Sequence, residues 1–249
     1  MYVTLKKKYG QNFLIDQNIL LKISNLIGLK KLNIIEIGPG DGRLTEKIIN
    51  CNPKKLTLIE VDKDLVPNLK NKFSNFQNIN ILNKNVLDLD VNIECDIIIS
   101  NLPYNISSQI LVKICSQNHL PKKCILMFQK EFANRLMENK LNSLNSLVKC
   151  FFEINKEFYV SKNCFRPIPK VDSAVLKFSK KKTLLLEKNE INKFIDFKRK
   201  IFSYKRKTLK SIFRKYKFKF DEIDLNQRVE EIDLCDFIKI FRKFKNETY

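Results

Sequence analysis

Short apolar runs alternate with amphipathic stretches along the first half of the chain. Five runs have the pattern of buried strands and lie at 33–37, 55–60, 79–82, 96–100 and 124–128. Each is short and ends at polar or turn-forming residues. Between them, residues 42–50, 63–73 and 107–117 carry apolar side chains near helical spacing. This βαβ rhythm predicts an α/β fold on a largely parallel sheet.

Further elements are predicted on both sides of this region. Residues 16–29 have the pattern of an amphipathic helix that Asp16 caps. Two more strands are predicted at 154–160 and 173–178, which brings the sheet to seven strands.

The strand pattern ends at about Lys188, and short helices are predicted from there on, including 205–215 and 233–244. Neither Gly nor Pro occurs after Pro169, so this part does not have the composition of a flexible linker. We predict a first domain at 1–182 and a small all-helical domain at 183–249.

Length and composition narrow the class of protein. The chain has 249 residues, of which 44% are apolar, enough for one large domain with a smaller companion. The start of the chain lacks the apolar stretch of a signal peptide, and the longest uncharged window, 97–112, contains Asn, Ser and Pro. Seven scattered cysteines without a CxxC pair favour reduced thiols over disulfides or a zinc site. We expect a cytoplasmic monomer with no metal and no membrane attachment.

The charge indicates a polyanionic partner. The formal net charge is +20, which favours nucleic acid. Codon drift towards A and T would also enrich Lys, Asn, Ile and Phe, but it would spread the lysines evenly. Residues 177–219 instead hold 17 Lys and Arg against 3 Asp and Glu, whereas 220–249 hold 5 against 8.

A glycine-rich turn follows the first predicted strand in "EIGPGDG", with Gly38, Gly40 and Gly42. Such a turn between a strand and a helix lets the backbone approach a ligand closely. Twenty residues after Gly40, Glu60 ends the next strand in "LIEVD", where a carboxylate can accept hydrogen bonds from both ribose hydroxyls. The two features together predict a cofactor that contains a nucleoside, although an ordinary tight turn with a capping acid is the simpler alternative.

The loop sequence decides between cofactors. A dinucleotide places its pyrophosphate on a full G-x-G-x-x-G/A turn, and Asp41 would repel that group. S-adenosylmethionine has no phosphate and carries a cationic amino-acid end, so it suits an acidic loop better.

The segment "NLPY" at 101–104 closes the fourth predicted strand. Pro103 fixes its own φ and keeps Leu102 extended, so the Leu102 carbonyl could face a pocket beside the Asn101 amide oxygen. Two adjacent acceptors fit the two hydrogens of an exocyclic amine, and Tyr104 offers a ring on which a base can stack. This arrangement suits methylation of adenine N6, with a buried strand exit as the alternative.

Six segments together resemble the ribosomal RNA adenine N6,N6-dimethyltransferases: "KKYGQNFLID", "IEIGPGDGRLT", "LIEVD", "SNLPYNISS", "FQKEFANRL" and "FRPIPKVDSAVLKF". The likeness continues through "KRKTLKSIF" and "QRVEEIDLCDFIKI", which are similar to the helical domain of the housekeeping small-subunit enzyme. The resemblance implies a Rossmann-like S-adenosylmethionine-dependent methyltransferase sheet with a helical C-terminal domain. It also implies dimethylation of two adjacent adenosines in a hairpin loop near the 3′ end of small-subunit rRNA, in a pre-30S particle late in ribosome assembly.

The resemblance also assigns residues. Together with Gly40 and Val61 from the two motifs above, the expected cofactor contacts are Asn12, Leu14, Gly38, Glu60, Asn85 and Asn101. Asn85 stands where the family usually carries Asp, so cofactor binding is expected to be weaker. Phe165 stands where the family places a ring near the target base, and with Tyr104 it could sandwich a flipped adenine.

The C-terminal helix pattern carries the predicted RNA contacts. Lys207, Lys210 and Arg214 fall on one face and Leu209, Ile212, Phe213 and Tyr216 on another. A merely solvated basic face is the alternative. Two other functions stay open at this point: a macrolide-resistance methylase acting on large-subunit rRNA, and a non-catalytic RNA-binding assembly or transcription factor.

Overall fold

The computed structural model describes residues 11–28, 31–89, 94–204, 206–214 and 223–248. The chain divides into two compact units, one of Met1–Ala133 with Ile154–Lys180 and one of Asn134–Glu153 with Lys181–Tyr249. The predicted boundary after residue 182 therefore needs one correction, because residues 134–153 pack with the second unit. Helix α6 (Asn145–Val148) contacts α7 (Ile191–Phe202), and the Leu141 amide donates to the Glu230 carbonyl, 3.1 Å away.

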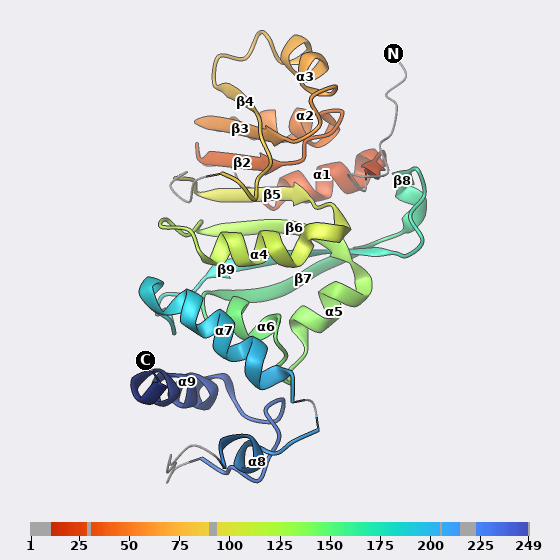
Figure 1. The fold of residues 1–249 in the computed structure, drawn as a ribbon. Helices are drawn as coiled ribbons and strands as arrows, with labels where there is room; N and C mark the ends of the chain where they lie inside the picture. Colours follow the sequence, from red (N-terminus) through yellow and green to blue (C-terminus); the bar gives the residue numbers. More distant parts are fainter. Residues whose placement is uncertain (1–10, 29–30, 90–93, 205, 215–222, 249) are drawn as a thin grey trace. The chain divides into compact units, whose positions relative to one another are not determined.

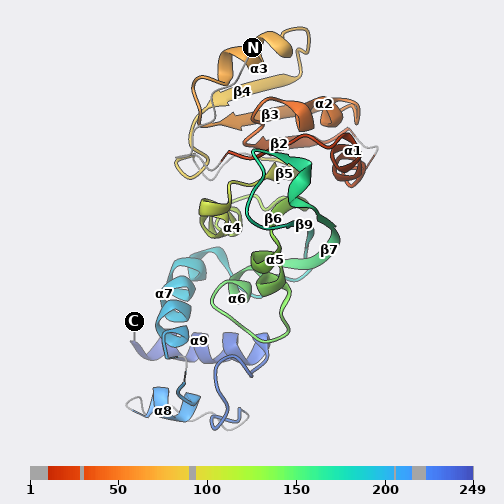
Figure 2. The ribbon, with the colours of Figure 1, turned by 90° about the vertical axis from the view of Figure 1, so that its right-hand side faces the viewer.

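A seven-stranded sheet forms the centre of the first unit, as predicted, with the order β4-β3-β2-β5-β6-β9-β7 (Figures 1 and 2). Its strands are β2 (Asn33–Ile37), β3 (Lys55–Glu60), β4 (Ile79–Asn83), β5 (Ile97–Asn101), β6 (Lys123–Gln129), β7 (Phe152–Val160) and β9 (Ser173–Lys180). The pairs from β4 to β6 are parallel, and β9 runs antiparallel to β6. The carboxyl ends of the parallel strands therefore meet at one edge.

Helices cover both faces of this sheet. One face packs against α1 (Gln17–Asn25), α2 (Arg43–Ile49) and α3 (Val66–Lys72), whose apolar residues share a core with Ile34, Leu58 and Ile99 of the strands. Figure 2 shows α4 (Ser107–Cys115) on the opposite side from α1 and α2. The Asp16 cap of α1 is confirmed, since its carboxylate accepts from the Ile19 amide at 3.0 Å.

A second, two-stranded sheet pairs β1 (Phe13–Leu14) with β8 (Phe165–Arg166). Neither strand was predicted from the sequence. Two-residue strands carry no periodicity, and they exist here only through the pairing of Phe13 with Arg166 and of Leu14 with Phe165. The β8 strand follows the short helix η3 (Lys162–Cys164).

The described part of the second unit is helical around a phenylalanine cluster. Phe194 and Phe197 of α7 pack against Phe237 and Phe241 of α9 (Leu234–Thr248), with ring centroids 5.1–5.7 Å apart. The predicted helix at 205–215 is shorter in the structure, where α8 (Leu209–Phe213) starts at a Thr208 cap. Residues 205 and 215–222, with Tyr216 among them, lie outside the described residues.

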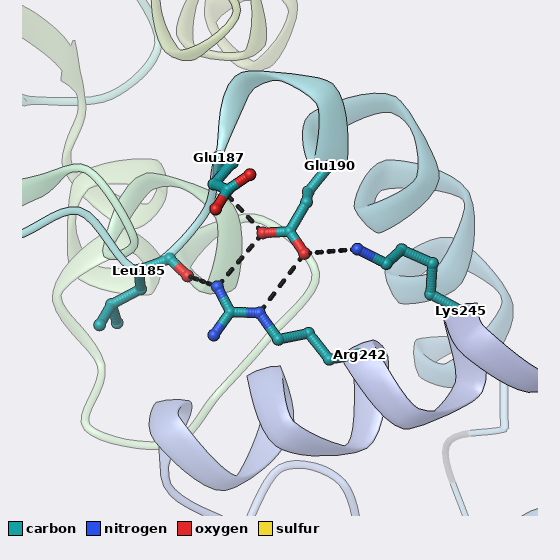
Figure 3. A network of polar contacts seen from close by, with 5 residues as sticks. All are labelled: Leu185, Glu187, Glu190, Arg242 and Lys245. Atoms are coloured by element: carbon teal, nitrogen blue, oxygen red, sulfur yellow. Dashed lines mark hydrogen bonds and ion pairs between the residues drawn. The ribbon is translucent and has the colours of Figure 1, made fainter.

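An ion cluster of Glu190, Arg242 and Lys245 connects the start of α7 with α9 (Figure 3). Glu190 ends the short helix η4 (Lys188–Glu190), and 4% of its side chain is exposed. Its carboxylate accepts from Lys245 Nζ at 2.8 Å and from Arg242 Nη2 at 3.2 Å. Arg242 also donates to the Leu185 carbonyl at 3.0 Å. A buried carboxylate is thereby matched by two cations.

Helix α5 (Lys130–Met137) links the two units along the chain, and η2 (Tyr104–Ile106) precedes α4. All seven cysteines lie in the described part and form no disulfide bonds. None of the described helices combines the length and the apolar character needed to cross a membrane.

Candidate active site

A cleft opens at the carboxyl ends of β2, β3 and β5 in the first unit, with about 770 Å³ of empty space that includes its open mouth. This is the edge of the sheet where ligands bind in α/β folds. It is lined by residues 11–14, 38–41, 43–44, 60–61 and 101–104, together with Leu20 and Glu36. Four segments that are far apart in the sequence therefore line the same cleft.

The glycine turn brings its backbone against β1. Gly40 has a φ of +62°, and its amide donates to Glu60 Oε2 at 3.1 Å. A Cβ at this position would lie 2.7 Å from Cε1 of Phe13. A glycine is needed here both for the left-handed backbone and for the close approach of the Phe13 ring.

Glu60 is held in place before any ligand binds. Its side chain is buried, with Oε1 accepting from the Asp62 amide at 2.8 Å and Oε2 from Gly40. Asn83 Nδ2 donates to the Glu60 carbonyl at 2.8 Å, which fixes the backbone of the strand end. Burial raises the pKa of Glu60, although the backbone hydrogen bonds from Asp62 and Gly40 oppose that shift. The carboxylate is oriented as a hydrogen-bond acceptor at the cleft.

Asp41 in the same loop also lines the cleft. Its Oδ2 lies 2.8 Å from Nε of Arg43, so the acid carries its own counterion. The pair leaves the loop polar without presenting an unpaired cation to a phosphate group.

Glu36 is a cleft residue that the sequence analysis missed. It lies on β2, is 1% exposed, and accepts from Thr45 Oγ1 at 2.6 Å. Burial raises its pKa to about 8, with the Thr45 hydrogen bond acting against the shift and the nearby Glu60 and Asp41 carboxylates adding to it. An acid inside the apolar run "NIIEI" is the sequence signal that could have revealed it, because a buried charge needs a reason.

Asn101 is the last residue of β5 and pairs with Met127 of β6. Its Nδ2 donates to the Asn12 carbonyl at 3.0 Å, so the nitrogen of the side-chain amide points towards β1. The oxygen of the same amide, Oδ1, therefore points away from Asn12. Next to it, the Ser100 hydroxyl donates to the Ile37 carbonyl at 2.5 Å, which ties this strand end to the glycine turn.

Pro103 and Tyr104 complete the tetrapeptide at this strand end. Pro103 has φ −60° and ψ 121°, an extended conformation that delays the start of the helix until Tyr104. The Tyr104 hydroxyl lies 2.6 Å from Ser173 Oγ at the start of β9. Burial raises the pKa of this phenol, with the Ser173 hydrogen bond opposing the shift. Both residues line the cleft together with Asn101 and Leu102, so the whole tetrapeptide borders it.

Most predicted cofactor contacts converge on the cleft: Asn12, Leu14, Gly38, Gly40, Glu60, Val61 and Asn101 all line it. Residues 1–10, which include the start of the segment "KKYGQNFLID", lie outside the described residues, but Gln11 lines the cleft and its Nε2 donates to Asp62 Oδ2 at 2.9 Å.

Two predicted site residues lie elsewhere. Asn85 does not line the cleft, and its Oδ1 accepts from the Leu87 amide at 3.1 Å within a turn. Phe165 is fully buried in the core beside Leu14 and does not reach the cleft either. Stacking of Phe165 on a substrate base therefore stays a prediction that requires this ring to become exposed.

The predicted RNA contacts lie in the second unit. Lys207 and Arg214 line an open hollow with Tyr204, Ser211 and Ile212, and the Lys207 ammonium lies 5.2 Å from the centre of the Tyr204 ring. Lys210 is exposed on α8. Among the residues that the structure describes, no group of three or more His, Cys, Asp or Glu is placed to hold a metal ion.

Comparison with known proteins gives one consistent result. Residues 3–246 match the family described as "Ribosomal RNA adenine dimethylase". The chain is 38% identical over 260 residues to the ribosomal RNA small subunit methyltransferase A of Mycoplasma capricolum, covering 95% of this chain and 96% of that protein. It is 34% identical to the protein of the same name from Sulfurihydrogenibium, with 97% of each covered.

Solved structures show the same fold. A dimethyladenosine transferase from Plasmodium falciparum superposes with a TM-score of 0.81 at 27% identity, over 94% of this chain and 98% of that one. The 23S rRNA methyltransferase ErmE superposes with a TM-score of 0.73 at 23% identity, over 94% and 99%. The predicted Rossmann-like α/β methyltransferase fold is confirmed.

Proposed function

Since the chain belongs to the family of ribosomal RNA adenine dimethylases, we propose that it dimethylates N6 of two adjacent adenosines in small-subunit rRNA. The family fixes the class of enzyme, a methyltransferase that uses S-adenosylmethionine and acts on rRNA adenine. The observation that carries the finer proposal is the convergence of Glu60, the glycine turn and Asn101–Tyr104 on one cleft. The target is a hairpin loop near the 3′ end of the rRNA, in a pre-30S particle that the enzyme meets as a monomer in the cytoplasm during ribosome biogenesis.

The cleft fits the cofactor chemically. Glu60 presents a preorganised carboxylate to the ribose hydroxyls, and the turn around Gly40 allows the amino-acid end to approach the backbone. The Asp41–Arg43 pair leaves the loop without an unpaired cation for a phosphate, which suits a ligand that has no phosphate. When bound, the cofactor would supply a methyl group activated by its sulfonium; its sulfur would leave as a neutral thioether, and the methylated amine would release one proton to solvent.

The catalytic share of the protein is to orient and activate the amine. The adenine amine is a weak nucleophile, because its lone pair is delocalised into the ring. Asn101 Oδ1 and the Leu102 carbonyl accept its two hydrogens and favour a pyramidal nitrogen, while the Tyr104 ring stacks on the base. The contact of Tyr104 with Ser173 keeps that ring in position. Because the leaving group is neutral, positioning and local electrostatics account for most of the effect.

RNA affinity comes from the basic side chains of the second unit. Lys207, Lys210 and Arg214 contact phosphates, and Tyr204 beside Lys207 offers a surface for an unstacked base. These contacts supply strength and salt sensitivity, while the shape of the hairpin supplies selectivity.

The test is to incubate the protein with isotope-labelled S-adenosylmethionine and small subunits that lack the modification. Label on two adjacent adenosines near the 3′ end of the small-subunit rRNA is expected by mass mapping. Label confined to large-subunit rRNA would support the macrolide-resistance type of methylase instead. RNA binding without any label would support a non-catalytic assembly factor.

A further inference from the structure

An exposed tyrosine with two lysines stands on the outer strand of the sheet in the first unit. Tyr159 of β7 is 44% exposed, more than most of the aromatic residues that the structure describes. Lys156 Nζ donates to its hydroxyl at 2.9 Å and lies 4.1 Å from the ring centre. Lys130 Nζ, from the start of α5, lies 5.0 Å from the same ring centre. We call Lys130, Lys156 and Tyr159 the β7 cluster.

The two ammonium groups of the cluster carry no carboxylate counterion among the residues that the structure describes. Lys177 of the neighbouring strand β9 does have such a partner, because its Nζ lies 2.5 Å from Glu157 Oε1. Two like charges held at one ring repel each other, and the ring offsets this only in part. A bound anion would relieve the repulsion, so the cluster has the charge pattern of an anion site.

The cluster lies at the same sheet edge as the catalytic tetrapeptide. The Lys130 amide donates to the Asp172 carbonyl at 2.9 Å, and the Lys162 amide just after β7 donates to Asp172 Oδ1 at 3.0 Å. The next residue, Ser173, holds the Tyr104 hydroxyl. In the sheet order β5-β6-β9-β7, the cluster is three strand spacings from Asn101, roughly 14 Å. An RNA strand of a few nucleotides spans that distance.

We propose that the β7 cluster binds the phosphodiester backbone of the RNA strand next to the target adenosine. This inference rests on the proposed function and names a contact of the same active site. The two ammonium groups neutralise phosphate charge, and the Tyr159 ring holds them at a fixed separation. The strand is thereby aligned so that the base beside it enters the cleft at Tyr104. RNA is favoured as the anion because the proposed substrate of the enzyme is itself a polyanion, and because the cluster lies at the sheet edge where the substrate base enters the cleft.

The test replaces Lys130 and Lys156 together by Gln and measures methylation kinetics and affinity on small subunits that lack the modification. We expect KM and Kd for RNA to rise about five- to tenfold, with kcat within twofold and S-adenosylmethionine affinity unchanged. The slope of log K against log salt should fall by about 1.4, the value for two phosphate contacts on a single strand. Exchange of both lysines for Arg should retain wild-type affinity.

The matched control is the double exchange of Lys54 and Lys55 for Gln. These two exposed lysines stand at the amino end of β3, the opposite end of the strands from the cleft, and the exchange removes the same charge. The control should change RNA affinity less than twofold. Equal effects of the two double variants would overturn the proposal, as would a fall in kcat at unchanged KM.

Two outcomes separate this inference from the proposed function. A wild-type protein that binds small subunits lacking the modification without methylating them would contradict the proposed function, while the comparison of affinities still tests the cluster. If the Lys130 and Lys156 variant lost binding to labelled polyglutamate but kept its RNA affinity, the cluster would be a site for an acidic polypeptide, and the RNA assignment would be wrong.

Discussion

A single amide group, that of Asn101, is central to the proposed chemistry at the cleft. Asn101 donates through Nδ2 to the Asn12 carbonyl, so its Oδ1 is the atom left to accept from the substrate amine. Exchange of Asn101 for Ala removes that acceptor, and we expect kcat to fall at least about 100-fold, as when one preorganised polar group is removed from an active site. Single-turnover methylation of saturating RNA measures this effect.

Two further measurements make the Asn101 result specific. RNA affinity of the Ala variant should stay within twofold of wild type, and exchange for Asp, which keeps an acceptor oxygen, should retain more activity than Ala. An Ala variant with unchanged turnover would show that the amide is not an acceptor in the reaction.

Residue identity could be predicted at some positions of the cleft and not at others. Glu60 and the tetrapeptide at 101–104 were predicted because the type of residue and its place after a strand both point to chemistry. Glu36 was missed, since one acid in an apolar run has no spacing that marks it as part of a cleft. The position of the Phe165 ring depends on pairing with β1, which no local pattern in the sequence records.

At the scale of elements, the contact between the glycine turn and β1 decides whether the cleft forms. Exchange of Gly40 for Ala places a Cβ against the Phe13 ring and forces a non-Gly residue into a left-handed backbone. We expect S-adenosylmethionine affinity to fall at least tenfold by calorimetry, with a loss of stability of about 1–2 kcal/mol from the backbone strain alone.

Gly28 provides the matched control for that exchange. It has a φ of +90°, but nothing lies within 4 Å of a Cβ built there, so Ala costs only backbone strain. The Gly28 variant should lose similar stability and keep its cofactor affinity. Equal losses of affinity in the two variants would mean that general destabilisation, and not the Phe13 contact, explains the Gly40 result.

The ion cluster of Glu190, Arg242 and Lys245 makes the stability of the second unit depend on pH in a predictable way (Figure 3). Burial raises the pKa of Glu190, but the hydrogen bonds from Arg242 and Lys245 outweigh it and lower the pKa to about 2. A carboxyl group whose pKa is lowered in the folded state stabilises the protein at pH values above the pKa that the group has in the unfolded chain. This contribution is lost as the pH falls from about 4.5 towards 2.

Exchange of Glu190 for Gln should therefore lower the free energy of unfolding at pH 7 by about 2–3 kcal/mol. The difference from wild type should shrink below about pH 4.5, as urea titrations at several pH values would show. Asp196, which is 69% exposed and 3.9 Å from Arg199 on α7, is the matched control. Its exchange for Asn should cost less than about 0.5 kcal/mol at any pH. A constant difference between the Gln variant and wild type down to pH 3 would contradict the role of the carboxylate charge.

Elements with a strong local pattern were predictable, the strands to within one or two residues and the helices less closely at their ends. All seven strands of the main sheet and the first four helices of the chain follow from apolar runs and caps. The short pair β1 and β8 was not predictable, because two residues show no period. The helix predicted at 205–215 extends in the structure only over Leu209–Phe213, since Thr208 is extended and caps it. The place of residues 134–153 depends on long-range packing against the second unit, which periodicity does not show.

At the scale of the whole molecule, the two basic sets proposed to bind RNA lie in different units of a chain with a formal net charge of +20. The β7 cluster belongs to the first unit, and Lys207, Lys210 and Arg214 belong to the second. The sequence predicted only the second set, because the lysines there are adjacent in sequence, whereas Lys130 and Lys156 meet only through the fold.

Exchange of Lys207, Lys210 and Arg214 together for Gln should weaken RNA binding and reduce its salt dependence, with kcat at saturating RNA preserved. Removal of three phosphate-binding cations from a single-stranded site lowers the slope of log K against log salt by about 2. An unchanged affinity and slope, measured by fluorescence anisotropy, would show that this basic surface is merely solvated.

Combining these three exchanges with those at Lys130 and Lys156 tests whether the two sets act separately. They share no contact partner among the described residues, so their effects on the free energy of RNA binding should add to within about 0.5 kcal/mol. Additivity would mean that the RNA uses both sets at once and that each set contributes independently. A combined loss no larger than that of the triple variant would mean that the β7 cluster engages the strand only after the second unit has bound it.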